Sequence, residues 1–119
     1  MTQEEQQIID VLITAIKGGN LIRFEYNGQI RIVEPYLIGE LYCKFQNHLE
    51  EGKFALRAWF TSGQSNRPID KIQGDRWRIY ELDKMIEIQI LSETNKIVRP
   101  FYDPDDKDFK RINFRVNVK

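Results

Sequence analysis

The first twenty residues carry one apolar stripe at the spacing of an α-helix. Apolar side chains recur every three or four positions, which places them on one helical face: Ile8, Ile9, Leu12, Ile13 and Ile16. Thr2 and Glu5 are spaced as a capping box, and Gly18-Gly19 suits the left-handed backbone that often ends a helix. The pattern predicts a helix over residues 3–17, packed on the rest of the chain through Ile9, Leu12, Ile13 and Ile16.

From residue 21 onward the apolar positions alternate with polar ones, as in a β-strand. Ile22, Phe24 and Tyr26 lie on one face of the first such segment. Asn27-Gly28 follows, and this pair favours a tight hairpin because both turn positions need a positive φ. Ile30 and Ile32 then continue on the return strand, which we expect Pro35 to close.

Further strands are predicted along the remaining chain, and polar or turn-rich segments separate them. The turn-rich residues 61–75 are interpreted as a loop, long enough to be a candidate for function. In the tail, Ile112, Phe114, Val116 and Val118 alternate with polar residues, so residues 109–119 are predicted to pair with a sheet edge or with a second copy. The other predicted strands are residues 41–45, 54–60, 77–82 and 85–91.

One helix followed by six or seven short strands predicts a single domain over residues 1–119. The expected fold is mainly β with one N-terminal α-helix, and it forms a small β-barrel or a strongly bent sheet with a C-terminal extra strand. Between the strands at 77–82 and 85–91 the chain has no Gly or Pro. We expect a single helical turn there, capped by Asp83, with Leu82, Met85 and Ile86 filling the end of the barrel.

Composition narrows the function classes. Hydrophobic residues make up 41% of the chain and charged residues 30%, which is typical of a globular domain. The formal net charge is zero, which argues against a protein that coats nucleic acid through bulk charge, although a local basic patch is compatible with it. The acidic N-terminus resembles no secretory signal. A single cysteine, Cys43, favours a reducing, cytoplasmic location.

Four segments in this order resemble the WYL domain family, most closely its short stand-alone bacterial or phage-type members: IRFEYNGQIRIVEP, LRAWFTSGQS and WRIYELDKMI, preceded by a helix that ends in Ala-Ile. The resemblance covers about residues 8–91. It implies an Sm-like five-stranded barrel over about residues 21–91, with residues 92–119 as an extension. It also implies a ligand-sensing module of the kind found in bacterial transcription regulators and defence systems, whose basic groove binds nucleic acids or nucleotide-like ligands.

The resemblance also implies particular ligand-binding residues. Arg31 matches the arginine of the family's Arg-x-x-Glu-Pro stretch. Arg78, Tyr80 and Lys84 match a later motif, in which Glu81 stands where the family has an arginine. Residues 54–56, Phe-Ala-Leu, fall where the name-giving Trp-Tyr-Leu would fall, so only the leucine is kept.

Arg57 and Arg78 are each flanked by apolar residues in a predicted strand, so each points to the face opposite its neighbours. An arginine in such a position suits a bidentate grip on phosphate or carboxylate. The alternative is a solvated exterior, or an ion pair with Glu25 or Glu81. We expect Arg57, Arg78 and Lys84 to converge on one groove near a loop in which Gly63 and Ser65 form an anion nest. The predicted ligand-binding residues are Arg31, Arg57, Ser65, Arg78, Tyr80 and Lys84.

No catalytic residue, metal site or cofactor is predicted. His48 is the only histidine and has no second His or Cys nearby, so it lacks the partners of a zinc site or a nucleophile. The segment Asp-Pro-Asp-Asp-Lys-Asp at 103–108 lacks the glycine and glutamate of a calcium loop. Four aromatic residues could stack on bases, but at least half of them are expected in the core: Tyr36, Tyr42, Trp59 and Trp77.

Two functions follow from these observations. The leading hypothesis is a non-enzymatic module with a regulatory role that binds a nucleotide or single-stranded nucleic acid in a basic groove. The alternative is a structural module for homo-oligomerisation, or for docking on a separate regulator protein, through the tail strand or the barrel edges. No membrane partner is expected, because no apolar run approaches the roughly 20 residues of a membrane-spanning helix.

Overall fold

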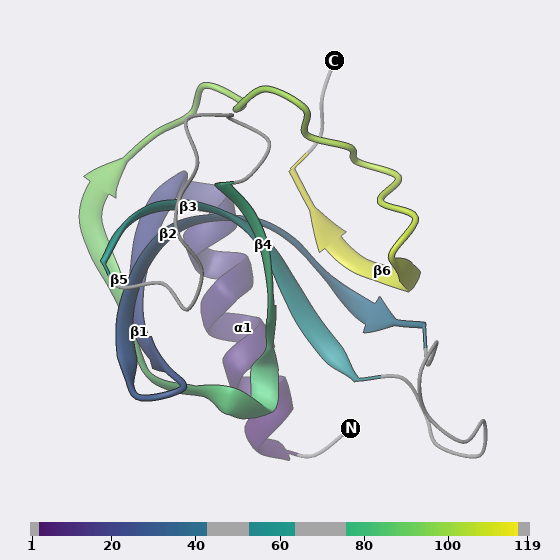
Figure 1. Ribbon diagram of the computed structural model, residues 1–119, viewed down its shortest axis with the longest axis horizontal. Helices are drawn as coiled ribbons and strands as arrows, with labels where there is room; N and C mark the ends of the chain where they lie inside the picture. The colour runs from purple at the N-terminus through teal and green to yellow at the C-terminus, as the bar shows by residue number, and fades with distance from the viewer. Residues whose placement is uncertain (1–2, 43–52, 64–75, 117–119) are drawn as a thin grey trace.

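The computed structural model describes residues 3–42, 53–63 and 76–116. An N-terminal helix lies along one face of a strongly curved, antiparallel six-stranded sheet (Figure 1). Several predicted features fall outside the described residues: Cys43, His48, Ser65, the segment 43–45 of one expected strand and most of the long loop. In the described part of the chain, no helix combines the length and the apolar character needed to cross a membrane.

The helix α1 (Gln3–Gly18) confirms the helix predicted at 3–17. Ile9, Leu12 and Ile16 are buried, as the apolar stripe predicts, whereas Ile13 is only partly buried. Gly19 ends the helix with a φ of 68°, and its N–H donates to the Ile16 carbonyl at 3.1 Å. This left-handed position explains why glycine stands there, since other residues adopt it at a cost.

The sheet follows the order β4-β3-β2-β1-β5, and β6 pairs with β2. Its strands are β1 (Asn20–Tyr26), β2 (Gln29–Leu41), β3 (Phe54–Gly63), β4 (Trp77–Glu81), β5 (Met85–Thr94) and β6 (Phe109–Arg115). The sheet is not closed, because β4 and β5 stand at its two ends. The bent sheet of the sequence-based expectation is therefore observed, and the closed barrel is not.

The β1–β2 hairpin turns at Asn27-Gly28, with φ values of 52° and 75°, as the sequence predicts. The expectation that Pro35 ends the return strand is wrong, since β2 continues to Leu41. A register shift on the β3 side lies between Pro35 and Leu37. Proline has no N–H to donate, and an irregularity of this kind lets the strand pass through it.

The β4–β5 connection is the single helical turn that the sequence predicts, η2 (Leu82–Lys84). Leu82 and Met85 are buried, as expected. Two details were wrong. The Asp83 side chain does not cap the turn but accepts a hydrogen bond from Lys53 Nζ at 3.2 Å, and Ile86 is 52% exposed rather than part of the core.

The two faces of the sheet carry separate hydrophobic clusters. The inner cluster joins α1 to residues that include Phe24, Val33, Leu56 and Phe60. The outer cluster contains Tyr36, Leu37, Ala55, Trp59 and Phe109. Tyr36 and Trp59 are thus buried, Trp77 is partly buried and Tyr42 is exposed, which agrees with the expectation that at least half of these aromatics belong to the core.

Of the tail predicted as a strand at 109–119, β6 covers 109–115 and pairs with the second half of β2, which is the first of the two predicted arrangements. Residues 117–119 lie outside the described part of the chain. Gly39 of β2 lies opposite Ile112, and a Cβ at Gly39 would collide with the backbone carbonyl oxygen of Arg111. The absence of a side chain at this position lets the two strands approach each other.

Candidate anion-binding site

Arg31 and Arg78 both project from the inner face of the sheet. Arg31 of β2 is in register with Phe24, and Arg78 of β4 is in register with Ala58, and both of these partners belong to the inner cluster. Only 4% of Arg31 and 7% of Arg78 is exposed. Both arginines are therefore buried, which rules out the solvated exterior considered for Arg78.

Two tyrosines form the walls beside Arg31. The rings of Tyr26 and Tyr80 meet edge to face with their centroids 5.0 Å apart. The Arg31 guanidinium lies 5.7 Å from the Tyr26 ring and 6.0 Å from the Tyr80 ring, within the range of cation–π attraction. Burial raises the pKa of Tyr80 above its ordinary value, and the nearby charges of Arg31 and Arg78 oppose that rise.

The hydrogen bonds of Arg31 go to neutral acceptors. Its Nη2 donates to the Tyr26 carbonyl at 3.3 Å and to Gln29 Oε1 at 3.1 Å. Within the described residues, no carboxylate pairs with Arg31, and neither its Nε nor the Tyr80 hydroxyl has a hydrogen-bond partner. A buried charge is costly unless a counter-charge and hydrogen bonds compensate it. The site therefore offers a cation and two unused polar groups to an anion.

Gly63 and Lys84 are two further residues that the sequence places at the expected groove. Gly63, in the proposed anion nest, is the β3 register partner of Arg31. Lys84 binds Glu81 Oε2 at 2.7 Å, so Glu81, which stands where the family has an arginine, neutralises this lysine. Glu81 lies on the face opposite to Tyr80, since it is in register with Ala55 of the outer cluster.

The prediction that Arg57 converges with Arg78 and Lys84 on one groove is wrong. Arg57 is in register with Ile79, whereas Arg78 is in register with Ala58, so the two arginines project from opposite faces of the sheet. Its Nε contacts Asp106 Oδ2 at 2.7 Å and its Nη2 contacts Asp108 Oδ2 at 2.6 Å. An ion pair was the stated alternative for Arg57, but with Glu25 or Glu81. Arg57, Arg78 and Lys84 therefore do not form one groove.

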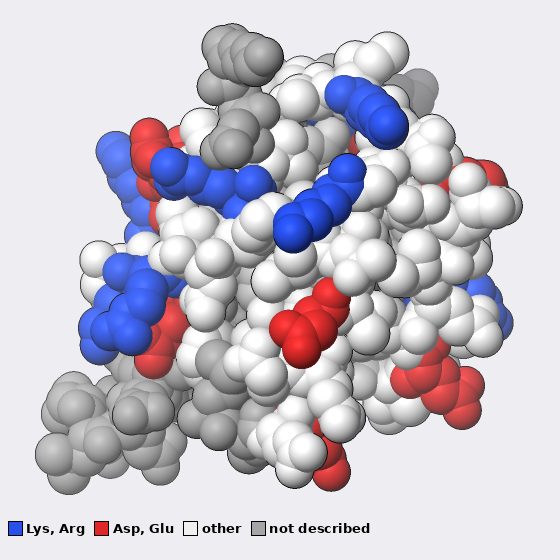
Figure 2. Space-filling view, turned by 180° about the vertical axis from the view of Figure 1, so that it is seen from behind, with Lys and Arg blue, Asp and Glu red and all other residues white. Residues whose placement is uncertain are grey.

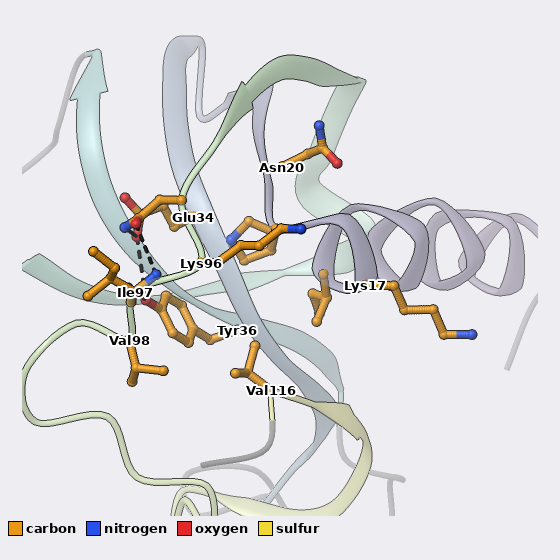
Figure 3. Close-up of a pocket in the computed structure, with 12 residues that line it drawn as sticks. Lys17, Asn20, Glu34, Tyr36, Lys96, Ile97, Val98 and Val116 are labelled. Carbon is orange, nitrogen blue, oxygen red and sulfur yellow. Dashed lines mark hydrogen bonds between the residues drawn. The ribbon is translucent and has the colours of Figure 1, made fainter. Parts of the chain in front are cut away.

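Sequence reasoning missed a second charged network, centred on Glu34 (Figure 3). The buried Glu34 carboxylate accepts hydrogen bonds from Arg99 Nη2 at 2.7 Å and from Asn95 Nδ2 at 3.0 Å. The Arg99 guanidinium also lies 5.4 Å from the Trp59 ring. The available signal was the position of Glu34 within the apolar stretch 32–38 of β2, because a buried carboxylate needs a cationic partner.

The Glu34 network borders a cavity of about 130 Å³ between the end of α1 and residues 95–98. The Tyr36 hydroxyl accepts a hydrogen bond from the Arg99 N–H at 3.0 Å, and burial raises the pKa of Tyr36 to about 12. In Figure 3 the Lys96 side chain extends toward the C-terminal end of α1, while Lys17 points away from the cavity. The hydrogen bonds to Glu34 and Tyr36 join residues 95–99 to β2.

Charge is spread unevenly over the face that Figure 1 hides. Figure 2 shows most of the blue side chains of that face along its left side and across its upper half, with red ones beside and below them. No part of the described chain groups three His, Cys, Asp or Glu side chains in a way that could hold a metal ion.

Within the described residues, Arg31, Arg78 and Tyr80 are the predicted ligand-binding residues that lie together.

Comparison of the chain with protein-family models, with curated proteins and with solved structures finds no match.

Proposed function

We propose that this protein is a non-enzymatic binding module, similar to WYL domains, in which Arg31, Arg78 and Tyr80 hold an anionic ligand. The observation that supports it best is the Arg31 guanidinium, which is buried yet hydrogen-bonded only to neutral groups among the described residues. In this proposal the bent sheet is an open variant of the family's Sm-like barrel, and the module serves a cytoplasmic regulator of bacterial type.

The chemistry of the site favours a phosphate-bearing ligand with a base or another flat group. A guanidinium forms paired hydrogen bonds with phosphate oxygens, and Arg31 Nε and the Tyr80 hydroxyl are available donors. The Tyr26 ring, which is partly exposed, adds a flat surface that could contact a base, whereas the Tyr80 ring is buried and contributes its hydroxyl. A nucleotide or a short single strand satisfies both requirements. Because few cations are close by, we expect contacts to only one or two phosphates.

A titration with nucleotides and short oligonucleotides at two salt concentrations tests the proposal. Affinity should fall with salt with a shallow slope, as expected for few phosphate contacts. Arg31→Gln should weaken binding by about 1–3 kcal/mol, the value of a charge-assisted hydrogen bond. The matched control is Arg111→Gln, which removes an exposed arginine from β6 and should leave binding unchanged.

Stability measurements separate a binding role from a structural one. Arg31→Gln should not unfold the domain, because it removes a buried charge that no described carboxylate neutralises. Absence of binding by the wild type at low salt, or equal binding by Arg31→Gln and the control, would refute the proposal.

A second candidate function is self-association through β5. Among the described strands, β5 pairs only with β1, so its other edge carries unpaired backbone groups. Ile86 and Ile90 of β5 are exposed, and Ile8, Val11, Ile86 and Ile88 line an open groove of about 380 Å³ between β5 and α1. Sedimentation should then show a dimer that Ile90→Lys dissociates, and a wild-type monomer at all concentrations would exclude this function.

A further inference from the structure

The outer face of the sheet holds a further pocket, whose lining residues differ in chemistry from those of the anion site. Its volume is about 230 Å³, and its walls come from β3, β4 and the segment before β6. Three of the lining side chains are aromatic and three are charged: Trp77, Phe101, Tyr102, Asp103, Asp106 and Arg57. Hydrophobic packing alone would not bring two carboxylates to an aromatic wall.

Hydrogen bonds fix two of the aromatic rings. The Trp77 indole N–H donates to the Pro100 carbonyl at 2.7 Å, and the Tyr102 hydroxyl donates to the Val116 carbonyl at 2.8 Å. Their rings stack with centroids 5.7 Å apart and an interplanar angle of 28°. These contacts hold both rings in place before any ligand binds, which lowers the cost of ordering them.

Phe101 combines an exposed ring with an unfavourable backbone conformation. It is 76% exposed, and its φ of 67° is in the left-handed region that phenylalanine rarely adopts. An aromatic residue in that conformation carries backbone strain, and an exposed ring gains little from burial that would offset it. A ligand that packs against the Phe101 ring would account for both features.

The charges of the pocket favour a cation over an anion. Arg57 is neutralised by its contacts with Asp106 and Asp108. Asp103 makes no ion pair with another described residue, and its Oδ1 accepts a hydrogen bond only from the Asp105 N–H, at 2.9 Å. The pocket therefore combines electron-rich aromatic rings with one exposed carboxylate that forms no ion pair within the described part of the chain. This is the combination by which proteins recognise quaternary ammonium groups.

We propose that Trp77, Phe101, Tyr102 and Asp103 form a binding site for a methylated or quaternary ammonium cation. The ligand is either a free small molecule such as choline or a trimethylated lysine on a peptide, since both present the same head group. The aromatic rings contact the methyl groups, and Asp103 supplies the counter-charge. The site is independent of the anion site, because it lies on the other face of the sheet and uses none of the same residues.

An NMR titration of the wild-type protein tests this site. The chain has two tryptophans, so two indole N–H resonances report on Trp59 and Trp77 separately. Choline should shift the Trp77 resonance in a saturable way, and its uncharged isostere dimethylbutanol should not. Sodium chloride at the same ionic strength serves as the salt control. A parallel titration with a trimethyllysine peptide distinguishes a free small molecule from a modified peptide, because the natural type of ligand should bind more tightly.

Variants locate the contacts. Phe101→Ala should raise the dissociation constant of choline about 2- to 5-fold, as for loss of an exposed cation–π contact. Asp103→Asn should raise it by a similar factor, about 2- to 5-fold, because an exposed charge is screened by solvent. Ile97→Ala is the control, since Ile97 is also exposed on this segment but lies outside the pocket. Equal affinity for choline and dimethylbutanol, no shift of Trp77, or unchanged binding by both variants would overturn the proposal.

Discussion

Replacement of Arg57 by methionine tests whether this arginine stabilises the fold or binds an anion. Methionine keeps much of the apolar stem and removes the guanidinium. The structure assigns this guanidinium to Asp106, whose side chain is 10% exposed, and to Asp108, whose side chain is 50% exposed. The expected effect of Arg57→Met is therefore a loss of stability, with no loss of anion binding.

The magnitude follows from the burial of the two carboxylates. Breaking a fully buried ion pair costs about 3–5 kcal/mol, because a charge remains without its partner. Half of Asp108 is already solvated, so we expect about 2–3 kcal/mol for Arg57→Met, mainly from Asp106. With a urea m-value of about 1–3 kcal/mol/M, the unfolding midpoint should fall by about 0.7–3 M.

Urea unfolding followed by circular dichroism measures this effect, with Arg111→Met as a control that removes an exposed arginine. A double-mutant cycle with Asp106→Asn should show a coupling free energy of at least ~1 kcal/mol, since the two residues form one contact. A destabilisation below ~0.5 kcal/mol, accompanied by loss of nucleotide binding, would refute the structural role of Arg57.

Three further outcomes follow from the fold. Leu12→Ala should cost about 2–5 kcal/mol in urea unfolding, because Leu12 is completely buried, and deletion of residues 1–17 should abolish cooperative unfolding. Gly39→Val should detach β6 from β2, because the valine Cβ would collide with the Arg111 carbonyl oxygen. Amide hydrogen exchange over 109–115 should then be fast, and protected amides there would contradict the role of Gly39. Burial raises the pKa of Tyr36 and of Tyr102 from 10.0 to about 12. Both residues should therefore stabilise the folded state fully below pH 10, and this contribution should be lost as the pH rises through 12. Unchanged urea midpoints across that range would contradict their burial.

Local patterns were sufficient to predict the local elements. The stripe of α1 is set by residues three and four positions apart, and the Asn27-Gly28 turn depends on the φ values of two adjacent residues. The helical turn after β4 was predicted for the same reason, since a short segment without Gly or Pro had to reverse direction. In each case the determining interactions lie within a few residues of one another.

Contacts between distant residues were not predictable in this way. Arg57 lies 49 residues from Asp106, and Glu34 lies 65 residues from Arg99. Strand alternation showed that Arg57 and Arg78 each face away from their apolar neighbours. It could not show that those neighbours lie on opposite faces of the sheet, because that depends on the β3–β4 register. Likewise, the continuation of β2 past Pro35 depends on its pairing with β3 and β6.

Binding of an anion by the buried Arg31 guanidinium can be observed by NMR of the arginine side-chain Nε–H groups during a nucleotide titration. Among the described residues, Arg31 Nε has no hydrogen-bond acceptor in the absence of ligand. If Arg31 holds the ligand, its Nε–H resonance should shift downfield in a saturable way, together with changes at Tyr80. The shift should be absent in Arg31→Gln and reduced by salt. An unchanged Arg31 signal while the nucleotide binds elsewhere, or no binding at low salt, would show that Arg31 does not bind an anion.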